Sequence, residues 1–175
     1  TYMPAFEALV TEAKVEGVMG AYNRTNGEAC CDSPYLMSEV LWNKWNFDGY
    51  YVSDCGAVED IWKNHKLCET PEEAVAMTIK TGMTLNCGSA YKSMAKAVEL
   101  GLLTEEEITA ALIQLTKTKF RLGFFDPEDE IPFSEIFSLN QPLGQMSVTM
   151  CVPSSPLPGG LELLVKELSQ ILAYL

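Results

Sequence analysis

The residues best suited to chemistry stand at the end of a short apolar run, in the sequence Gly-Tyr-Tyr-Val-Ser-Asp-Cys-Gly at 49–56. Residues 50–52 suffice for one buried strand, and Gly56 then lets the backbone turn away. A carboxylate at the C-terminal end of a buried strand is where parallel α/β sheets and barrels keep their active sites. We therefore interpret Asp54 as a candidate catalytic residue. The alternative is that it only caps the next helix.

Size and charge narrow the class of protein. The chain has 175 residues, 47% of them hydrophobic, and falls short of the roughly 250 residues of a complete eight-stranded α/β barrel. Its net charge of -12 argues against nucleic acid and anionic membrane surfaces as partners. No apolar run reaches the roughly 18 residues of a membrane span, and no signal segment is recognisable. The sequence opens inside a helix pattern, which predicts that further sequence precedes it.

The cysteines show no C-x-x-C pair. There are six: Cys30, Cys31, Cys55, Cys68, Cys87 and Cys151. We predict mostly free, buried thiols, with one disulfide in an oxidising compartment as the alternative. A zinc site with the single histidine, His65, has no ligand spacing behind it, so the sequence predicts no metal and no cofactor.

Three strand–helix units position these residues. Pro4 begins a helix whose apolar stripe contains Tyr2, Phe6, Leu9, Val10 and Ala13. Residues 18–22 follow as a buried strand and residues 23–27 as a loop. Asp32 or Ser33 caps the next helix, which leads through a turn at 46–49 into the strand at 50–52. The predicted inward face of that helix is Leu36, Met37, Val40, Leu41 and Trp45.

The third unit begins with a capping box, Thr70-Pro71-Glu72-Glu73, and a second box, Thr104-Glu105-Glu106-Glu107, starts the last helix. Between them we predict a strand at 83–87, an exit loop at 88–89 and a helix at 91–100. The predicted inward face of the last helix is Ile108, Ala111, Leu112, Leu115 and Phe120.

This order requires parallel strands and crossover helices. Three parallel strands cannot close, so the predicted fold is α/β, a partial (β/α)8 TIM-type barrel of about the last three strand–helix units followed by a non-matching tail. We assign 1–138 to the partial barrel, 139–160 to a linker or disordered segment, and 161–175 to an amphipathic helix.

Five motifs, in order along the chain, resemble the second half of the catalytic barrel of glycoside hydrolase family 3. They are Val18-Met19-Gly20-Ala21-Tyr22-Asn23, Asn26-Gly27, Gly49-Tyr50-Tyr51-Val52-Ser53-Asp54, Leu85-Asn86-Cys87-Gly88 and Phe120-Arg121-Leu122-Gly123-Phe124-Phe125-Asp126. The family contains β-glucosidases and β-xylosidases. Two departures are Thr84, where the family usually has aspartate, and the region after about 139, which an aberrant join or frame shift would explain.

The resemblance implies a retaining exo-β-glycosidase with Asp54 as its nucleophile and an oligosaccharide or glycoside as substrate. It places Tyr22 and Met19 in the sugar pocket; from the residues alone, Tyr22 is equally a core aromatic and Met19 a core gap-filler. Cys55, a third candidate substrate-binding residue, stands where many β-glucosidases carry tryptophan. Its small side chain resembles the β-xylosidase-like and bacterial polysaccharide-degrading branches, so both substrate types stay open. A periplasmic or extracellular location also follows from the family.

The acid/base residue is expected outside this chain, since Glu59 and Asp60 suit a solvated helix face. We therefore expect little or no activity from the isolated chain. Two other functions stay open: a non-catalytic carbohydrate-binding or assembly module, and an unrelated α/β ligand-binding domain. The latter is weakened by the absence of a Gly-x-Gly-x-x-Gly loop.

Overall fold

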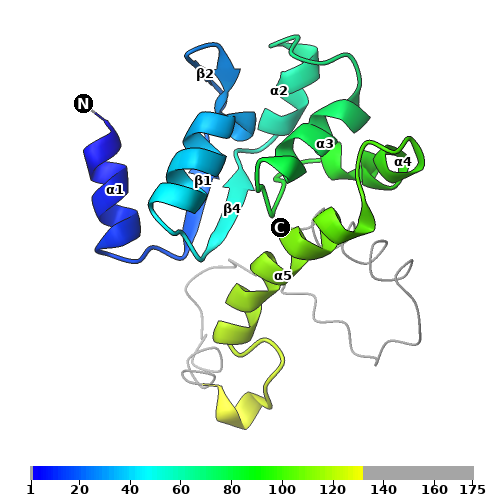
Figure 1. Ribbon diagram of the computed structural model, residues 1–175. Helices are drawn as coiled ribbons and strands as arrows, with labels where there is room; N and C mark the ends of the chain where they lie inside the picture. The colour runs from blue at the N-terminus through cyan, green and yellow to red at the C-terminus, as the bar shows by residue number, and fades with distance from the viewer. Residues whose placement is uncertain (1, 132–175) are drawn as a thin grey trace, which may run out of the picture.

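The computed structural model describes residues 2–131, so the segments predicted at 139–160 and 161–175 lie outside the described residues. Helices and strands are mixed along the chain, and the fold is α/β (Figure 1). The strands are β1 (Gly17–Gly20), β2 (Arg24–Thr25), β3 (Glu28–Ala29) and β4 (Tyr50–Ser53). The helices are α1 (Met3–Thr11), the π-helix η2 (Pro34–Lys44), α2 (Ala57–Lys63), α3 (Pro71–Lys80), α4 (Met94–Glu99) and α5 (Glu105–Arg121). The short 3-10 turns are η1 (Cys30–Asp32), η3 (Ala90–Ser93) and η4 (Glu128–Glu130).

Three parallel segments form the centre of the fold. Strands β1 and β4 pair in parallel, with Met19 opposite Val52. A third segment runs parallel beside β4, because Val52 bridges to Leu85 and the Ser53 N–H donates to the Leu85 carbonyl at 3.0 Å. The strand predicted at 83–87 is therefore present only as this bridge, without a regular ladder. All three segments point the same way and end at one edge.

The two faces of strand β4 lie in different environments. Tyr51 and Ser53 are buried, whereas Tyr50 and Val52, which point the other way, are only partly covered. Because side chains alternate along a strand, Asp54 lies on the same side as Val52. The candidate catalytic residue thus faces away from the buried core.

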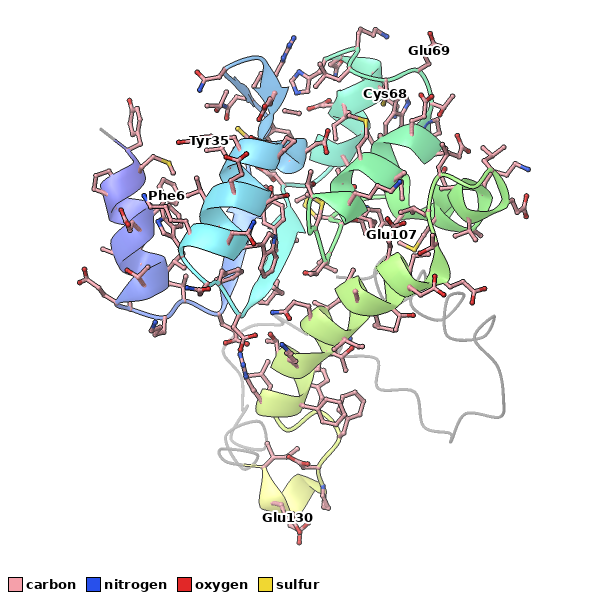
Figure 2. The ribbon with its side chains drawn as sticks, in the orientation of Figure 1. Phe6, Tyr35, Cys68, Glu69, Glu107 and Glu130 are labelled. Atoms are coloured by element: carbon pink, nitrogen blue, oxygen red, sulfur yellow. A yellow bond between two sulfur atoms is a disulfide. The ribbon has the colours of Figure 1, made fainter. Side chains whose placement is uncertain are left out.

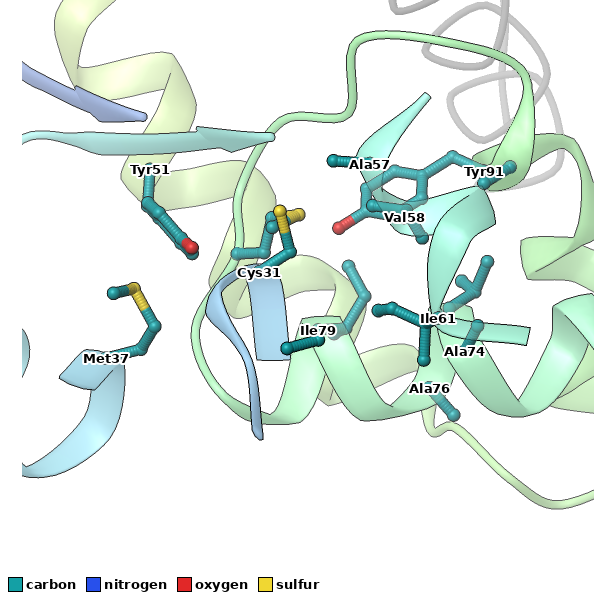
Figure 3. Close-up of a cluster of buried hydrophobic side chains, with 14 of the residues drawn as sticks. Cys31, Met37, Tyr51, Ala57, Val58, Ile61, Ala74, Ala76, Ile79 and Tyr91 are labelled. Carbon is teal, nitrogen blue, oxygen red and sulfur yellow. The ribbon is translucent and has the colours of Figure 1, made fainter. Parts of the chain in front are cut away.

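The buried core lies on the face of Tyr51, where β4 meets η2, α2 and α3. Figure 3 shows Tyr51 and Cys31 within this cluster, together with Val58 and Ile61 of α2 and Ile79 of α3. The Tyr51 hydroxyl donates to the Cys30 carbonyl at 3.0 Å, which satisfies the one polar group that this ring brings into the core.

Part of the predicted loop at 23–27 is a β-hairpin: Arg24 pairs with Ala29 and Thr25 with Glu28. Asn26 and Gly27 both have positive φ, at 55° and 94°, as a tight two-residue hairpin turn requires. The prediction of a plain loop was wrong because the two strands are too short to show alternation.

Ser33 is the cap of η2, since its hydroxyl accepts from the Leu36 N–H at 3.0 Å. Asp32, the other predicted cap, is instead buried in η1 at 8% exposure. The pKa of Asp32 is raised to about 7, mainly by burial and to a smaller extent by the charge of Glu28. A hydrogen bond with Thr81 acts in the opposite direction. The predicted inward face of η2 is confirmed for Met37, Val40, Leu41 and Trp45, which are buried, whereas Leu36 is only partly buried.

Both predicted capping boxes are confirmed, at Thr70–Glu73 and Thr104–Glu107. The predicted helix at 91–100 is divided into η3 and α4. The predicted inward face of α5 is wrong in part: Leu115 is buried, but Phe120 is 61% exposed.

A polar network anchors α5 to the beginnings of β1 and β4. Arg121 pairs with Glu16 at 2.9 Å and with Asp48 at 2.8 Å, and Lys117 pairs with Asp48 at 2.9 Å. The Gln114 amide donates to the Gly49 carbonyl at 2.8 Å. Hydrogen bonds from Lys117, Arg121 and Gln114 hold the pKa of Asp48 at about 2.

The apolar stripe predicted for α1 is largely uncovered within the described residues. Only Val10 is buried, whereas Phe6 is 52% exposed. Tyr35 of η2 is 51% exposed, and both aromatic residues are labelled in Figure 2. The predicted helix is therefore confirmed, but most of its apolar stripe has no cover within residues 2–131. No helix within residues 2–131 is long and apolar enough to cross a membrane.

Gly20 lets the hydroxyl of Tyr51 approach β1. A Cβ at Gly20 would overlap the Tyr51 hydroxyl oxygen and lie 2.9 Å from the Cys31 sulfur. We expect Gly20→Ala to lower the free energy of unfolding by about 1–3 kcal/mol, because a packed core resists added volume. Denaturant unfolding checks this, and Tyr51→Phe in the same chain should recover part of the loss. An equal loss in both backgrounds would show that the clash lies elsewhere.

The buried Asp32 makes stability depend on pH. Its folded pKa of about 7 lies above its ordinary value of 3.8, so the folded chain holds a proton that the unfolded chain releases, and stability falls as pH rises through this window. We expect Asp32→Asn to stabilise the chain by at most about 4 kcal/mol at about pH 8.5 and by much less at about pH 4.

Denaturant unfolding at both pH values measures this difference. Glu12→Gln, which removes an exposed carboxylate at the end of α1, is the matched control for the loss of a negative charge. The same gain from Asp32→Asn at both pH values would contradict a raised pKa.

Candidate active site

Asp54 is placed by the hydrogen bonding of β4. Its backbone N–H donates to the Gly20 carbonyl at 2.8 Å, which continues the pairing with β1 one residue beyond the strand. Gly56 has a φ of 82° and turns the chain into α2. Asp54 itself is half-buried. Its side chain is therefore accessible at a rigidly held strand end.

The carboxylate of Asp54 does not cap α2. The cap position is Gly56, with no side-chain hydrogen bond, and one carboxylate oxygen of Asp54 accepts from the Cys55 N–H at 2.7 Å. The alternative interpretation of Asp54 as a helix cap is therefore wrong. A carboxylate that must stay ionised to act as a nucleophile is favoured by hydrogen-bond donors or a cation beside it. The Cys55 N–H is such a donor, and no cation pairs with Asp54 within residues 2–131.

Buried polar groups behind Asp54 join β4 to the next parallel segment. The Ser53 hydroxyl accepts from the Cys87 N–H at 2.9 Å and donates to the Asn86 amide oxygen at 3.3 Å. Thr84, the residue that departs from the family's aspartate, bonds through its hydroxyl to both the N–H and the carbonyl of Tyr51, each at 3.0 Å. The threonine therefore satisfies the backbone of β4 without adding a charge.

A disulfide joins Cys55 to Cys87, across a sequence separation of 32 residues. The prediction of free thiols is thus wrong for these two cysteines, and the alternative of one disulfide is correct. Among the described residues, Cys30, Cys31 and Cys68 are free. The disulfide links the loop that follows Asp54 to the loop of the neighbouring segment. Next to it, the Gly56 N–H donates to the Cys87 carbonyl at 2.7 Å.

Tyr22 lies at the same edge of the sheet, two residues beyond β1. Its ring is 46% exposed, so it is not a core aromatic among the described residues. Its hydroxyl donates to the Cys55 carbonyl at 2.6 Å, one residue after Asp54. Partial desolvation and the neighbouring Asp54 carboxylate raise the pKa of Tyr22. The structure therefore brings Tyr22 and Asp54 together, as their placement after successive strands suggested.

Met19 is also not a core residue of the described part, because its side chain is 58% exposed. It stands opposite Val52 in the register of β1 and β4, on the face to which Asp54 belongs. Its predicted place in a sugar pocket remains a prediction.

Glu59 was expected on a solvated helix face, and the structure corrects this. Its carboxylate accepts from the Ser89 hydroxyl at 2.6 Å and pairs with Lys63 at 2.7 Å. These hydrogen bonds from Lys63 and Ser89 lower the pKa of Glu59. Glu59 thus fastens α2 to the exit loop at Ser89, and we do not assign it as a second catalytic carboxylate.

His65 also contributes to this region, and its contact is not predicted from the sequence. One nitrogen of its ring, Nε2, lies 2.8 Å from the backbone carbonyl of Tyr22. The sequence suggests for His65 only a role as a zinc ligand, and no group of three or more metal-binding side chains occurs in the described part of the chain. A contact across 43 residues to a backbone oxygen leaves no local sequence signal that could have revealed it.

Comparison with known proteins gives consistent matches. A sequence model described as the glycosyl hydrolase family 3 N terminal domain matches residues 1–118. A xylan 1,4-beta-xylosidase of Xylanibacter ruminicola is 41% identical over 138 residues, covering 78% of this chain and 16% of that protein. A beta-xylosidase/alpha-L-arabinofuranosidase of Medicago sativa subsp. varia is 42% identical over 127 residues, covering 72% of this chain and 16% of that protein.

A solved structure matches as well. It is a GH3 exo-beta-xylosidase in complex with a xylobiose aziridine activity-based probe, with a TM-score of 0.71 and 31% identity, covering 78% of this chain and 19% of that chain. The chain thus spans less than a fifth of the length of the proteins that it resembles.

The disulfide yields a direct prediction. Peptide mapping without reduction should recover Cys55 and Cys87 in one linked peptide. We expect Cys55→Ser with Cys87→Ser to lower the free energy of unfolding by at most about 4 kcal/mol, since the bond closes a long loop in the unfolded chain. Cys68→Ser, which removes a free thiol, is the control and should change stability little. Recovery of Cys55 as an alkylated thiol from the unreduced chain would refute the pairing.

Proposed function

The chain belongs to glycosyl hydrolase family 3, and from this premise we propose that it forms about the last three strand–helix units of a (β/α)8 catalytic barrel. The barrel is that of a retaining exo-β-glycosidase, which hydrolyses terminal non-reducing β-linked sugars, and Asp54 is its nucleophile. The observation that carries this proposal is the half-buried Asp54 carboxylate, held at the carboxyl edge of three parallel segments. In α/β barrels the catalytic groups lie at this edge.

The chemistry assigned to Asp54 is a double displacement. Its carboxylate attacks the anomeric carbon while the glycosidic C–O bond breaks, and a general acid gives a proton to the leaving oxygen. Water, deprotonated by the same acid/base group, then attacks the glycosyl–enzyme ester and frees Asp54. The second carboxyl group should lie about 5–5.5 Å from the first. We assign it to a part of the enzyme outside this chain, so the isolated chain should show little or no turnover of glycosides.

The substrate is of the β-xyloside type rather than the β-glucoside type. Both sequence relatives and the solved structure described above carry xylosidase names, at 41%, 42% and 31% identity. Similar solved structures from Listeria innocua, at 29% and 30% identity, are beta-glucosidases, so the xyloside assignment follows the higher identities of the two sequence relatives. In this chain the residue after Asp54 is Cys55, and its side chain is committed to the disulfide with Cys87. A compact sulfur bridge therefore stands where many β-glucosidases place a large indole ring. The same bridge supports an oxidising compartment, periplasmic or extracellular, because disulfides persist there.

Trapping of the glycosyl–enzyme tests the nucleophile. In the Xylanibacter ruminicola xylosidase, the matched segment of 138 residues is replaced by that of this chain, which gives a chimera with a complete barrel. A 2-fluoro-xyloside should add its sugar mass to the peptide that contains Asp54. We expect Asp54→Asn to reduce the labelling rate at least about 1000-fold, as removal of a covalent nucleophile does.

Asp60→Asn, a carboxylate on the adjacent helix α2, is the matched control and should label normally. A circular dichroism spectrum like that of the parent enzyme establishes that each variant is folded. Attachment of the sugar to another acidic residue would refute the assignment. Reversible binding of xylose without any adduct would favour the non-catalytic carbohydrate-binding module.

A further inference from the structure

We propose that His65 is a positioning residue, which holds Tyr22 beside the nucleophile through a hydrogen bond to the Tyr22 backbone. The proposal rests on the proposed function, because it takes Asp54 as the reacting group. It concerns a residue that lies two positions beyond the end of α2 and contacts a different strand-end loop.

The hydrogen bond defines which ring nitrogen of His65 carries a proton. A backbone carbonyl can only accept, so Nε2, at 2.8 Å from the Tyr22 oxygen, must carry the proton. In the neutral ring Nδ1 is then the unprotonated nitrogen. The protonated ring also donates from Nε2, so the contact persists in both charge states.

The ring is fixed to the same unit that carries Asp54. The His65 N–H donates to the Asp60 carbonyl at 2.7 Å, and the Leu67 N–H donates to the Ile61 carbonyl at 3.0 Å, which closes the end of α2. Ile61 is fully buried and holds α2 against the core. Asp54 precedes α2 by three residues and His65 follows it by two, so Asp54 lies near the beginning of α2 and His65 near its end.

Tyr22 is fastened to this unit twice. Its carbonyl accepts from His65, and its hydroxyl donates to the Cys55 carbonyl at 2.6 Å. Packing alone does not hold the ring, because it is 46% exposed. The next residue, Asn23, is tied instead to the hairpin, since its carbonyl accepts from the Cys30 N–H at 3.0 Å. His65 is thus the contact that joins the backbone of Tyr22 to the β4–α2 unit.

The consequence is that the phenol of Tyr22 is held in the neighbourhood of the reacting carboxylate. The ring hydroxyl is close enough for the Asp54 charge to contribute to the raised pKa of Tyr22. A small displacement of a positioned group near the reacting atoms lowers the rate strongly. Removal of the His65 donor should therefore slow chemistry at Asp54 although His65 itself touches neither sugar nor nucleophile.

The test measures the rate of 2-fluoro-xyloside labelling in the chimera described above. We expect His65→Leu to slow labelling about 10-fold, and His65→Gln, which keeps an N–H donor at a similar reach, to restore it to within about 3-fold of the parent rate. In a Tyr22→Phe background, His65→Leu should add little further loss, because both changes act on the same hydroxyl. A merely structural histidine would not show this rescue and non-additivity.

Three results would overturn the proposal: parent-like labelling with His65→Leu, no rescue by Gln, or fully additive losses. If the unsubstituted chimera gains no label, the proposed function fails instead. The contact can then still be decided in the 175-residue chain, because His65 is its single histidine and gives one set of imidazole nitrogen resonances. A neutral ring protonated on Nε2 agrees with the contact, and one protonated on Nδ1 excludes it.

Discussion

The close approach of β1 to β4 at Gly20 is the constraint on which the described structure depends. Because Gly20 has no side chain, the Tyr51 hydroxyl and the Cys31 sulfur occupy the space where a Cβ would stand. The Gly20 carbonyl in turn accepts from the Asp54 N–H at 2.8 Å. Cys31 also donates to this carbonyl at 3.4 Å, and burial raises the pKa of its thiol to about 12, so the sulfur acts as an inert packing group. One small residue thus connects the buried core to the placement of Asp54.

Beyond the strands, the candidate site is held by contacts between successive strand ends. Strand β1 contributes Tyr22, strand β4 contributes Asp54 and Cys55, and the third segment contributes Cys87. A phenol hydrogen bond and a disulfide both end on Cys55, the neighbour of Asp54. These contacts replace the regular ladder that the third segment lacks. The parallel fold brings the loops to one edge, and the side chains then fix their mutual positions.

At the opposite edge of the sheet, where the strands begin, ion pairs hold α5 in place. There Arg121 and Lys117 of α5 bind Glu16 and Asp48 at the strand beginnings, through ion pairs that are about half exposed. Exposed pairs of this kind contribute little stability individually, so their role is to set the orientation of α5. A barrel commonly divides its two edges in this way, with chemistry at the carboxyl ends of the strands and structural contacts at the other.

The sequence by itself determined the α/β order, both capping boxes, the position of Asp54 at a strand end and the family. Each of these features depends on residues that are close together in the chain. Only the tertiary structure decided the pairing of Cys55 with Cys87, the contact of His65 with Tyr22, and the exposure of Phe6 and Phe120. The two contacts join residues 32 and 43 positions apart, so no local pattern encodes them. The exposed aromatics show the same limit, since helical spacing indicates which side chains share a face but not what covers that face.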